Sequence, residues 1–94
     1  MIEAKSHKIN NIRRMKKILI VEDDVSIRNE LQKLLVNSGY ETIVMDNFES
    51  QIEFILESKA DLILLDINIP ILNGEMVLKE LRKKSDVPVI MVTS

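Results

Sequence analysis

Three short runs of wholly apolar residues constrain the fold of this chain more than any other feature of its sequence. A run that is only four residues long and apolar on both faces is typical of a central strand in a parallel sheet with helices on both sides. These runs are 18–21, 62–65 and 89–92. A fourth run, 42–45, is bounded by charged residues and suits a strand nearer the edge of the sheet.

The segments between these runs carry apolar residues at the spacing of an amphipathic helix. The first helix is predicted to start after Asp24 and to stop near Gly39, which supplies a left-handed C-terminal cap. Asn47 and Asn73 are candidate N-caps of the second and third helices. The order strand–helix–strand–helix–strand–helix–strand predicts an α/β fold with one parallel sheet. The apolar stripes of the three helices are Ile27, Leu31, Leu34 and Leu35, then Phe48, Ile52, Ile55 and Leu56, then Gly74, Val77, Leu78 and Leu81.

The composition supports one small folded domain. The chain has 94 residues, of which 46% are hydrophobic and 30% are charged. This is the balance of a globular domain, and the length allows only one core. Residues 1–15 hold four basic residues and one acidic residue, and we expect them to form a disordered basic leader outside the fold. The predicted domain spans residues 16–94.

Charge and composition also disfavour several classes of function. Residues 16–94 hold nine basic and fourteen acidic residues, so direct nucleic-acid binding by this segment is not expected, since phosphate neutralisation needs a basic face. No apolar run approaches the roughly 18 residues that cross a bilayer, so we expect no membrane contact and a cytoplasmic location. The chain has no cysteine, so any metal must be bound by oxygen ligands or by His7.

Acidic residues follow two of the apolar runs at the point where each predicted strand ends. Right-handed crossovers place these two strands side by side, and ligands bind at the carboxyl ends of strands in open parallel sheets. Several carboxylates at close quarters repel one another, and a hard divalent cation is their natural counter-charge. Oxygen ligands with retained waters favour Mg²⁺ over Zn²⁺. The acidic residues are Glu22, Asp23 and Asp24 after the first run and Asp66 after the run 62–65.

Each of these residues also has a simpler structural explanation. Aspartate is strongly favoured at N-caps, so Asp24 is better explained as the N-cap of the first helix than as a ligand. Asp66 could open a turn before Pro70. Thr93, which directly follows the run 89–92 and is therefore also a candidate, could be an ordinary β-branched strand residue. Their joint position at neighbouring strand ends favours the functional interpretation.

Three segments together resemble the receiver domains of two-component response regulators. They are KILIVEDD at 17–24, LDINIP at 65–70 and PVIMVTS at 88–94. The resemblance spans residues 16–94, and the segments occur in the family's order with spacings suited to the intervening helices. It implies a flavodoxin-like (CheY-like) three-layer α/β fold with strand order 2-1-3-4-5. It also implies a signalling module and not an enzyme, with self-catalysed phosphotransfer and autodephosphorylation at most.

The resemblance implies a role for each matched residue. Asp66 would be the phosphoacceptor, receiving a phosphoryl group from a sensor histidine kinase. Mg²⁺ would be bound by Asp23 and Asp66, and by Glu22 directly or through water. Asn68 would contribute its main-chain carbonyl to the same ion, and Thr93 would contact a phosphoryl oxygen and shift on activation. A DNA-binding transcription regulator is the implied parent protein.

The sequence departs from the family pattern after Ser94. Family members continue through a helix, a fifth strand that ends in a phosphoryl-binding lysine, and a last helix beside the first. We therefore expect an incomplete domain whose fourth strand, 89–92, is an uncovered edge, with much of the first-helix face of the sheet bare. A homodimer through the edge of that strand could restore some cover. Neither Lys83 nor Lys84 can be assumed to replace the missing lysine.

Other classes of protein fit parts of the pattern. A phosphatase of the haloacid-dehalogenase type also forms an aspartyl phosphate after a parallel strand, but it expects a second aspartate where Asn68 stands. A receiver-like half-domain that only binds a partner through its fourth strand is favoured by the chain length and opposed by the motifs. A nucleotide-binding fold is disfavoured, because Gly39 and Gly74 are the only glycines and cannot make a phosphate-cradling loop.

Overall fold

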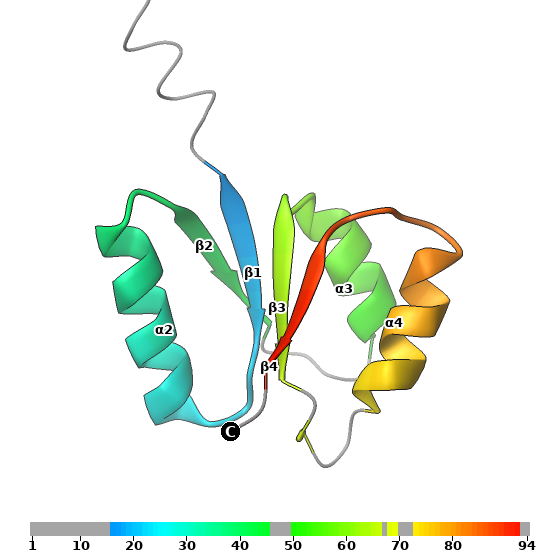
Figure 1. Cartoon of the computed structure of the whole chain (residues 1–94), viewed down its shortest axis with the longest axis horizontal. Helices are drawn as coiled ribbons and strands as arrows, with labels where there is room; N and C mark the ends of the chain where they lie inside the picture. Colours follow the sequence, from blue (N-terminus) through cyan, green and yellow to red (C-terminus); the bar gives the residue numbers. More distant parts are fainter. Residues whose placement is uncertain (1–15, 46–49, 67, 70–72, 93–94) are drawn as a thin grey trace, which may run out of the picture.

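Strands and helices alternate along the chain in the order that the sequence predicts (Figure 1). The computed structural model describes residues 16–45, 50–66, 68–69 and 73–92, so the predicted leader, 1–15, lies outside the described residues. No helix in these ranges combines the length and apolarity that crossing a membrane requires. The elements are β1 (Lys17–Val21), α2 (Val25–Asn37), β2 (Glu41–Val44), α3 (Gln51–Ser58), β3 (Leu62–Asp66), α4 (Gly74–Arg82) and β4 (Val89–Val92).

The four strands form one parallel sheet in the order β2-β1-β3-β4. This order agrees with the predicted flavodoxin-like topology as far as the described residues extend. β2 lies at an edge of the sheet, as predicted, and begins one residue earlier than the sequence indicates. In the central strand β1, the four residues after Lys17 are buried. The apolar runs of β1 and β3 form the two inner strands, as predicted. The equally apolar run of β4, also predicted as a central strand, lies at the other edge of the described sheet and is only partly buried.

Helices lie on both faces of the sheet, with α2 on one face and α3 and α4 on the other (Figure 1). The main core lies on the α3–α4 face, because alternate side chains of β1 and β3 point there and meet apolar residues from both helices. Gly74, Val77 and Leu81 of α4 are buried, as the predicted stripe requires. The buried residues of this core are Leu19, Val21, Met45, Ile55, Ile63, Leu65, Ile69, Val77 and Leu81.

Capping residues set the ends of the helices. Asp24 and Asn73, both predicted as N-caps, accept hydrogen bonds from backbone N–H groups three residues ahead, at 3.1 and 3.2 Å. At the end of α2, Gly39 has a φ of 95°. The N–H groups of Gly39 and Tyr40 donate to carbonyls in the last turn of α2, both at 3.0 Å. This Schellman arrangement satisfies the terminal carbonyls and depends on the backbone freedom of glycine.

The second helix begins later than the sequence predicts. Asn47 is the predicted N-cap, but α3 begins at Gln51 and Ser50 holds the N-cap position. The carbonyl of Ser50 accepts the first helical hydrogen bond, from the N–H of Phe54 at 3.0 Å, so the helical ladder starts there. Asn47 itself lies outside the described residues.

The α2 face of the sheet is only partly covered, as predicted. α2 contributes no buried residue, and Leu34 of its predicted apolar stripe is 62% exposed. Ile90 of β4 is 49% exposed. A groove of about 530 Å³ opens between α2 and the strands on this face. Its apolar lining consists of Ile18, Leu35, Tyr40, Leu62, Leu64 and Ile90.

Lys59, the C-cap of α3, adopts the left-handed conformation that glycine prefers, with φ 53° and ψ 36°. This conformation costs a residue with a Cβ about 1–2 kcal/mol. We predict that Lys59→Gly raises the free energy of unfolding by roughly 0.5–1 kcal/mol, once the greater chain entropy of unfolded glycine is subtracted. Urea denaturation measures the change. Lys59→Ala removes the same charge but keeps the Cβ, so equal unfolding midpoints for the two variants would contradict this explanation.

Candidate metal centre

The register of the sheet brings the two acidic strand ends together. β1 and β3 are parallel neighbours, and Val21 is the Cα partner of Leu65. Glu22 directly follows Val21 and Asp66 directly follows Leu65, so the two acidic residues lie at the same level of the sheet. The predicted meeting of acidic residues at neighbouring strand ends is therefore confirmed.

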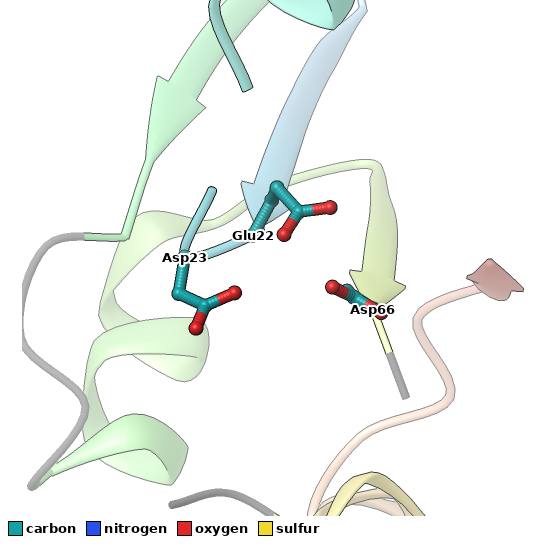
Figure 2. Close-up of side chains that lie close together, drawn as sticks. All are labelled: Glu22, Asp23 and Asp66. Atoms are coloured by element: carbon teal, nitrogen blue, oxygen red, sulfur yellow. The ribbon is translucent and has the colours of Figure 1, made fainter. Parts of the chain in front are cut away.

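Three carboxylates gather at this end of the sheet. Glu22, Asp23 and Asp66 each offer one oxygen, and these three oxygens lie within 4.8 Å of one another. Figure 2 shows Glu22 and Asp23, just after β1, turned toward the same space as Asp66 at the end of β3. Glu22 and Asp66 are each 3% exposed, whereas Asp23 is exposed. The cluster thus consists of a buried pair and one carboxylate that is open to solvent.

Backbone N–H groups orient the two buried carboxylates. Glu22 Oε2 accepts a hydrogen bond from the N–H of Asp24 at 3.1 Å, and Asp66 Oδ1 accepts one from the N–H of Asn68 at 2.9 Å. In both cases the donor lies two residues after the acceptor, so the chain turns back over its own carboxylate. These donors were not predicted from the sequence. An aspartate that bonds the N–H two residues ahead is a common turn, so the spacing of Asp66 and Asn68 was a usable signal.

The electrostatics of the cluster disfavour three ionised carboxylates. Burial raises the pKa of Glu22 above its ordinary value, and the carboxyl groups of Asp66 and Asp23 raise this pKa further. The hydrogen bond from the N–H of Asp24 acts in the opposite direction and lowers it. An added positive charge would therefore favour the ionised form of Glu22.

The donor set fits a hard divalent cation. In the part of the chain that the structure describes, the group that could hold a metal contains carboxylates only, without histidine. Zn²⁺ is usually bound by nitrogen or sulfur, whereas Mg²⁺ takes one or a few carboxylates and keeps several waters. The exposure of Asp23 leaves water access to the cluster. These residues therefore fit a hard cation such as Mg²⁺ better than they fit Zn²⁺.

Asp24 and Asn68 lie beside the cluster. Asp24 is the N-cap of α2, as the simpler explanation predicts, and its carboxylate is not one of the three in the group. Asn68 is exposed, and its N–H bonds Asp66. The predicted metal contact of the Asn68 main-chain carbonyl stays a prediction.

The remaining predicted residues contribute less to the described site. Thr93 lies outside the described residues, and the residue before it, Val92, is the Cα partner of Asp66 on the neighbouring strand. Lys83 forms an exposed ion pair with Glu80 at 3.1 Å on the surface of α4 and its C-cap. This pairing offers no support for Lys83 as a substitute for a phosphoryl-binding lysine.

Comparison with known families agrees with this fold. The family described as response regulator receiver domain matches residues 18–94. This chain therefore belongs to the response regulator receiver domain family, a class of signalling domains with a CheY-like fold. The phosphatase and nucleotide-binding alternatives are set aside by this match.

Relatives and solved structures give the same result. The transcriptional regulatory protein YxdJ of Bacillus subtilis is 39% identical over 80 residues, which is 85% of this chain and 35% of that protein. The N-terminal domain of the nisin resistance regulator NsrR, a lantibiotic response regulator, aligns with a TM-score of 0.78 and 38% identity, over 84% of this chain and 67% of that one. This chain spans about a third of the length of the curated relatives that it matches.

A third similar protein is the response regulator TrrA of Thermotoga maritima. Its complex with Mg²⁺ and BeF aligns with a TM-score of 0.75 and 38% identity, over 84% of this chain and 70% of that one. TrrA is also known in complex with the histidine kinase ThkA, and this chain aligns to that structure with a TM-score of 0.75 and 37% identity, over 85% of its length and 70% of the matched chain.

The raised pKa of Glu22 leads to a prediction about stability. In metal-free protein at neutral pH, Glu22→Gln should raise the melting temperature, because it removes a buried charge and can still accept the Asp24 N–H bond. The folded protein takes up a proton at Glu22 at a higher pH than the unfolded chain does. The melting temperature of the wild type should therefore rise relative to that of Glu22→Gln as the pH falls through the pKa of Glu22. Thermal unfolding in EDTA across a pH series measures this difference.

Glu53→Gln, which changes an exposed glutamate of α3, is the matched control and should not show this pH dependence. Mg²⁺ should stabilise the wild type more than Glu22→Gln. A melting-temperature difference that is independent of pH would show that the burial of Glu22 is not its cause.

Proposed function

We propose that this chain accepts a phosphoryl group on Asp66 with the help of Mg²⁺. The convergence of three carboxylates at adjacent strand ends is the observation that carries this proposal. Such a cluster combines a nucleophilic oxygen with a site for the cation that phosphoryl transfer needs. Family membership supports the same assignment, because receiver domains are signalling domains of response regulators.

The proposed reaction moves a phosphoryl group from a phosphohistidine of a sensor kinase to Asp66. A carboxylate oxygen of Asp66 forms a bond to phosphorus while the N–P bond of the donor breaks, and the electron pair of that bond returns to the histidine nitrogen. Hydrolysis of the acyl phosphate by water then yields inorganic phosphate and restores the carboxylate. Such self-catalysed steps would be the only chemistry of the domain.

The surrounding residues would position the groups that react. Asp23 and Asp66 would hold Mg²⁺, with Glu22 binding directly or through water and Asn68 adding its main-chain carbonyl. When bound, Mg²⁺ would neutralise charge on the phosphoryl oxygens. Thr93, which follows the strand partner of Asp66, would contact a phosphoryl oxygen.

The partners in this proposal come from the similar proteins. TrrA is known in complex with the histidine kinase ThkA, which supports a sensor histidine kinase as the phosphoryl donor here. YxdJ is a transcriptional regulatory protein, which supports a transcription regulator as the whole protein. We propose that this regulator binds DNA and acts in the cytoplasm. Residues 16–94 hold more acidic than basic residues, so we propose that this segment does not bind nucleic acid directly.

We predict that acetyl phosphate with Mg²⁺ adds one phosphoryl group to the wild type and none to Asp66→Asn. The amide of asparagine is not a nucleophile for phosphorus, so the reaction should be lost and not merely slowed. Intact-mass spectrometry measures the product. Asp86→Asn, an exposed aspartate before β4, is the matched control and should be labelled as the wild type is. Undiminished labelling of Asp66→Asn would identify another acceptor.

We also propose that the 94-residue chain self-associates through β4. Within the described ranges, β3 is the one strand that pairs with β4, which leaves the outer edge of β4 open. Such an edge presents unpaired backbone groups, and the half-exposed Ile90 adds apolar surface beside it. A second copy offers the same edge, so antiparallel pairing of two β4 strands would be symmetric.

Light scattering across a concentration series tests this association. The average mass should rise above that of the monomer as the concentration increases, and Ile90→Lys should shift this rise to higher concentrations. Met76→Lys is the matched control, because Met76 is 57% exposed on α4, which covers the opposite face of the sheet. A monomeric mass at every concentration would refute the proposal.

A further inference from the structure

Asp24 makes two separate contacts at the junction between β1 and α2. Its side-chain Oδ1 accepts the N–H of Ile27 at 3.1 Å, which caps the helix. Its own backbone N–H donates to Glu22 Oε2 at 3.1 Å. One residue therefore links the first turn of α2 to a buried carboxylate of the cluster.

The cap determines where the N–H of Asp24 points. Asp24 has φ −75° and ψ 115°, an extended conformation that differs from that of the helix it precedes. Its side chain is fixed by Ile27, and its carbonyl accepts the N–H of Arg28 at 2.9 Å. Because both bonds anchor Asp24 to the first turn, rotation about its backbone angles is restricted. The direction of its N–H is restricted with them.

The orientation of Glu22 depends on this N–H. The terminal torsion of a glutamate side chain has a broad energy minimum, so packing alone orients its carboxylate weakly. Glu22 is 3% exposed, and the bond from Asp24 holds Oε2. The same carboxylate offers an oxygen to the group that Glu22 forms with Asp23 and Asp66.

We propose that Asp24 is a positioning residue of the metal centre, which orients the carboxylate of Glu22 through the N-cap of α2. The role rests on the proposed function, since it concerns the same Mg²⁺ site. Asp24 does not contact the cation in this account. The Asp24 carboxylate caps α2, and this cap directs the backbone N–H of Asp24 toward Glu22.

A set of variants at residue 24 separates the cap from the charge. Asp24→Asn and Asp24→Ser keep an N-capping oxygen but lose the negative charge. Their Mg²⁺ affinities are therefore the reference for the variants that lose the cap. Asp24→Ala loses both the cap and the charge. Asp24→Gly keeps most of the helix stability, since glycine is a far better N-cap than alanine, but frees the backbone.

The measurement is Mg²⁺ affinity, from amide chemical shifts of the 94-residue chain during titration. Asp24→Ala and Asp24→Gly should bind Mg²⁺ about tenfold more weakly than Asp24→Asn, at the lower end of the effect of removing a group that orients a metal ligand. In metal-free protein, the N–H of residue 24 should be protected from hydrogen exchange in Asp24→Asn and less protected in Asp24→Gly.

Asn73→Ala is the matched control for the loss of a helix cap. Asn73 caps α4 with a bond of 3.2 Å to the N–H of Met76 and has a backbone conformation close to that of Asp24. Asn73→Ala should lower the melting temperature by about 4–8 °C, as a typical cap loss does in a domain of this size, and leave the Mg²⁺ affinity unchanged. This outcome would assign the effect at Asp24 to the link with Glu22 and not to general destabilisation.

Two results would overturn the proposal in distinguishable ways. Equal Mg²⁺ affinities of Asp24→Gly and Asp24→Asn would refute the positioning role while leaving the metal site intact. A wild type in which Mg²⁺ shifts no amides near Glu22, Asp23 and Asp66 would refute the metal site and the positioning role together.

Discussion

The parallel register between β1 and β3 is the constraint on which the rest of the structure depends. Pairing Val21 with Leu65 decides which side chains of the two central strands face the α3–α4 core. A shift of one residue would turn Leu19 and Val21 toward the opposite face. The same shift would separate Glu22 from Asp66. The core and the cluster of carboxylates are therefore specified by one set of backbone hydrogen bonds.

Because of this register, carboxylates that repel one another lie at the end of the packed apolar core. Glu22 and Asp66 are each 3% exposed, and burial raises the pKa of Glu22. N–H groups two residues ahead offset part of the cost of burying each carboxylate. A cation that binds only the folded chain would relieve the remaining repulsion and stabilise the fold by mass action. The repulsion between these carboxylates would thus both favour binding of a cation and destabilise the fold when no cation is bound.

The two faces of the sheet differ in how completely they are covered. α3 and α4 close the main core, whereas α2 leaves a groove and the half-exposed Ile90 on the other face. This chain covers about two thirds of the receiver-domain chain of NsrR that it resembles in structure. β4 ends beside the site, since Val92 is the strand partner of Asp66. Whatever covers β4 would therefore lie next to the carboxylate cluster.

Local patterns in the sequence determined the order of the elements, the caps at Asp24 and Asn73, and the acidic residues at the strand ends. These features depend on neighbouring residues or on the handedness of crossovers, so they can be predicted without coordinates. Only the tertiary structure decided that α3 starts at Gln51, that Leu34 stays exposed, and that the N–H of Asp24 holds a buried carboxylate. Burial and bond direction arise from segments far apart in the chain, and residue spacing does not encode them.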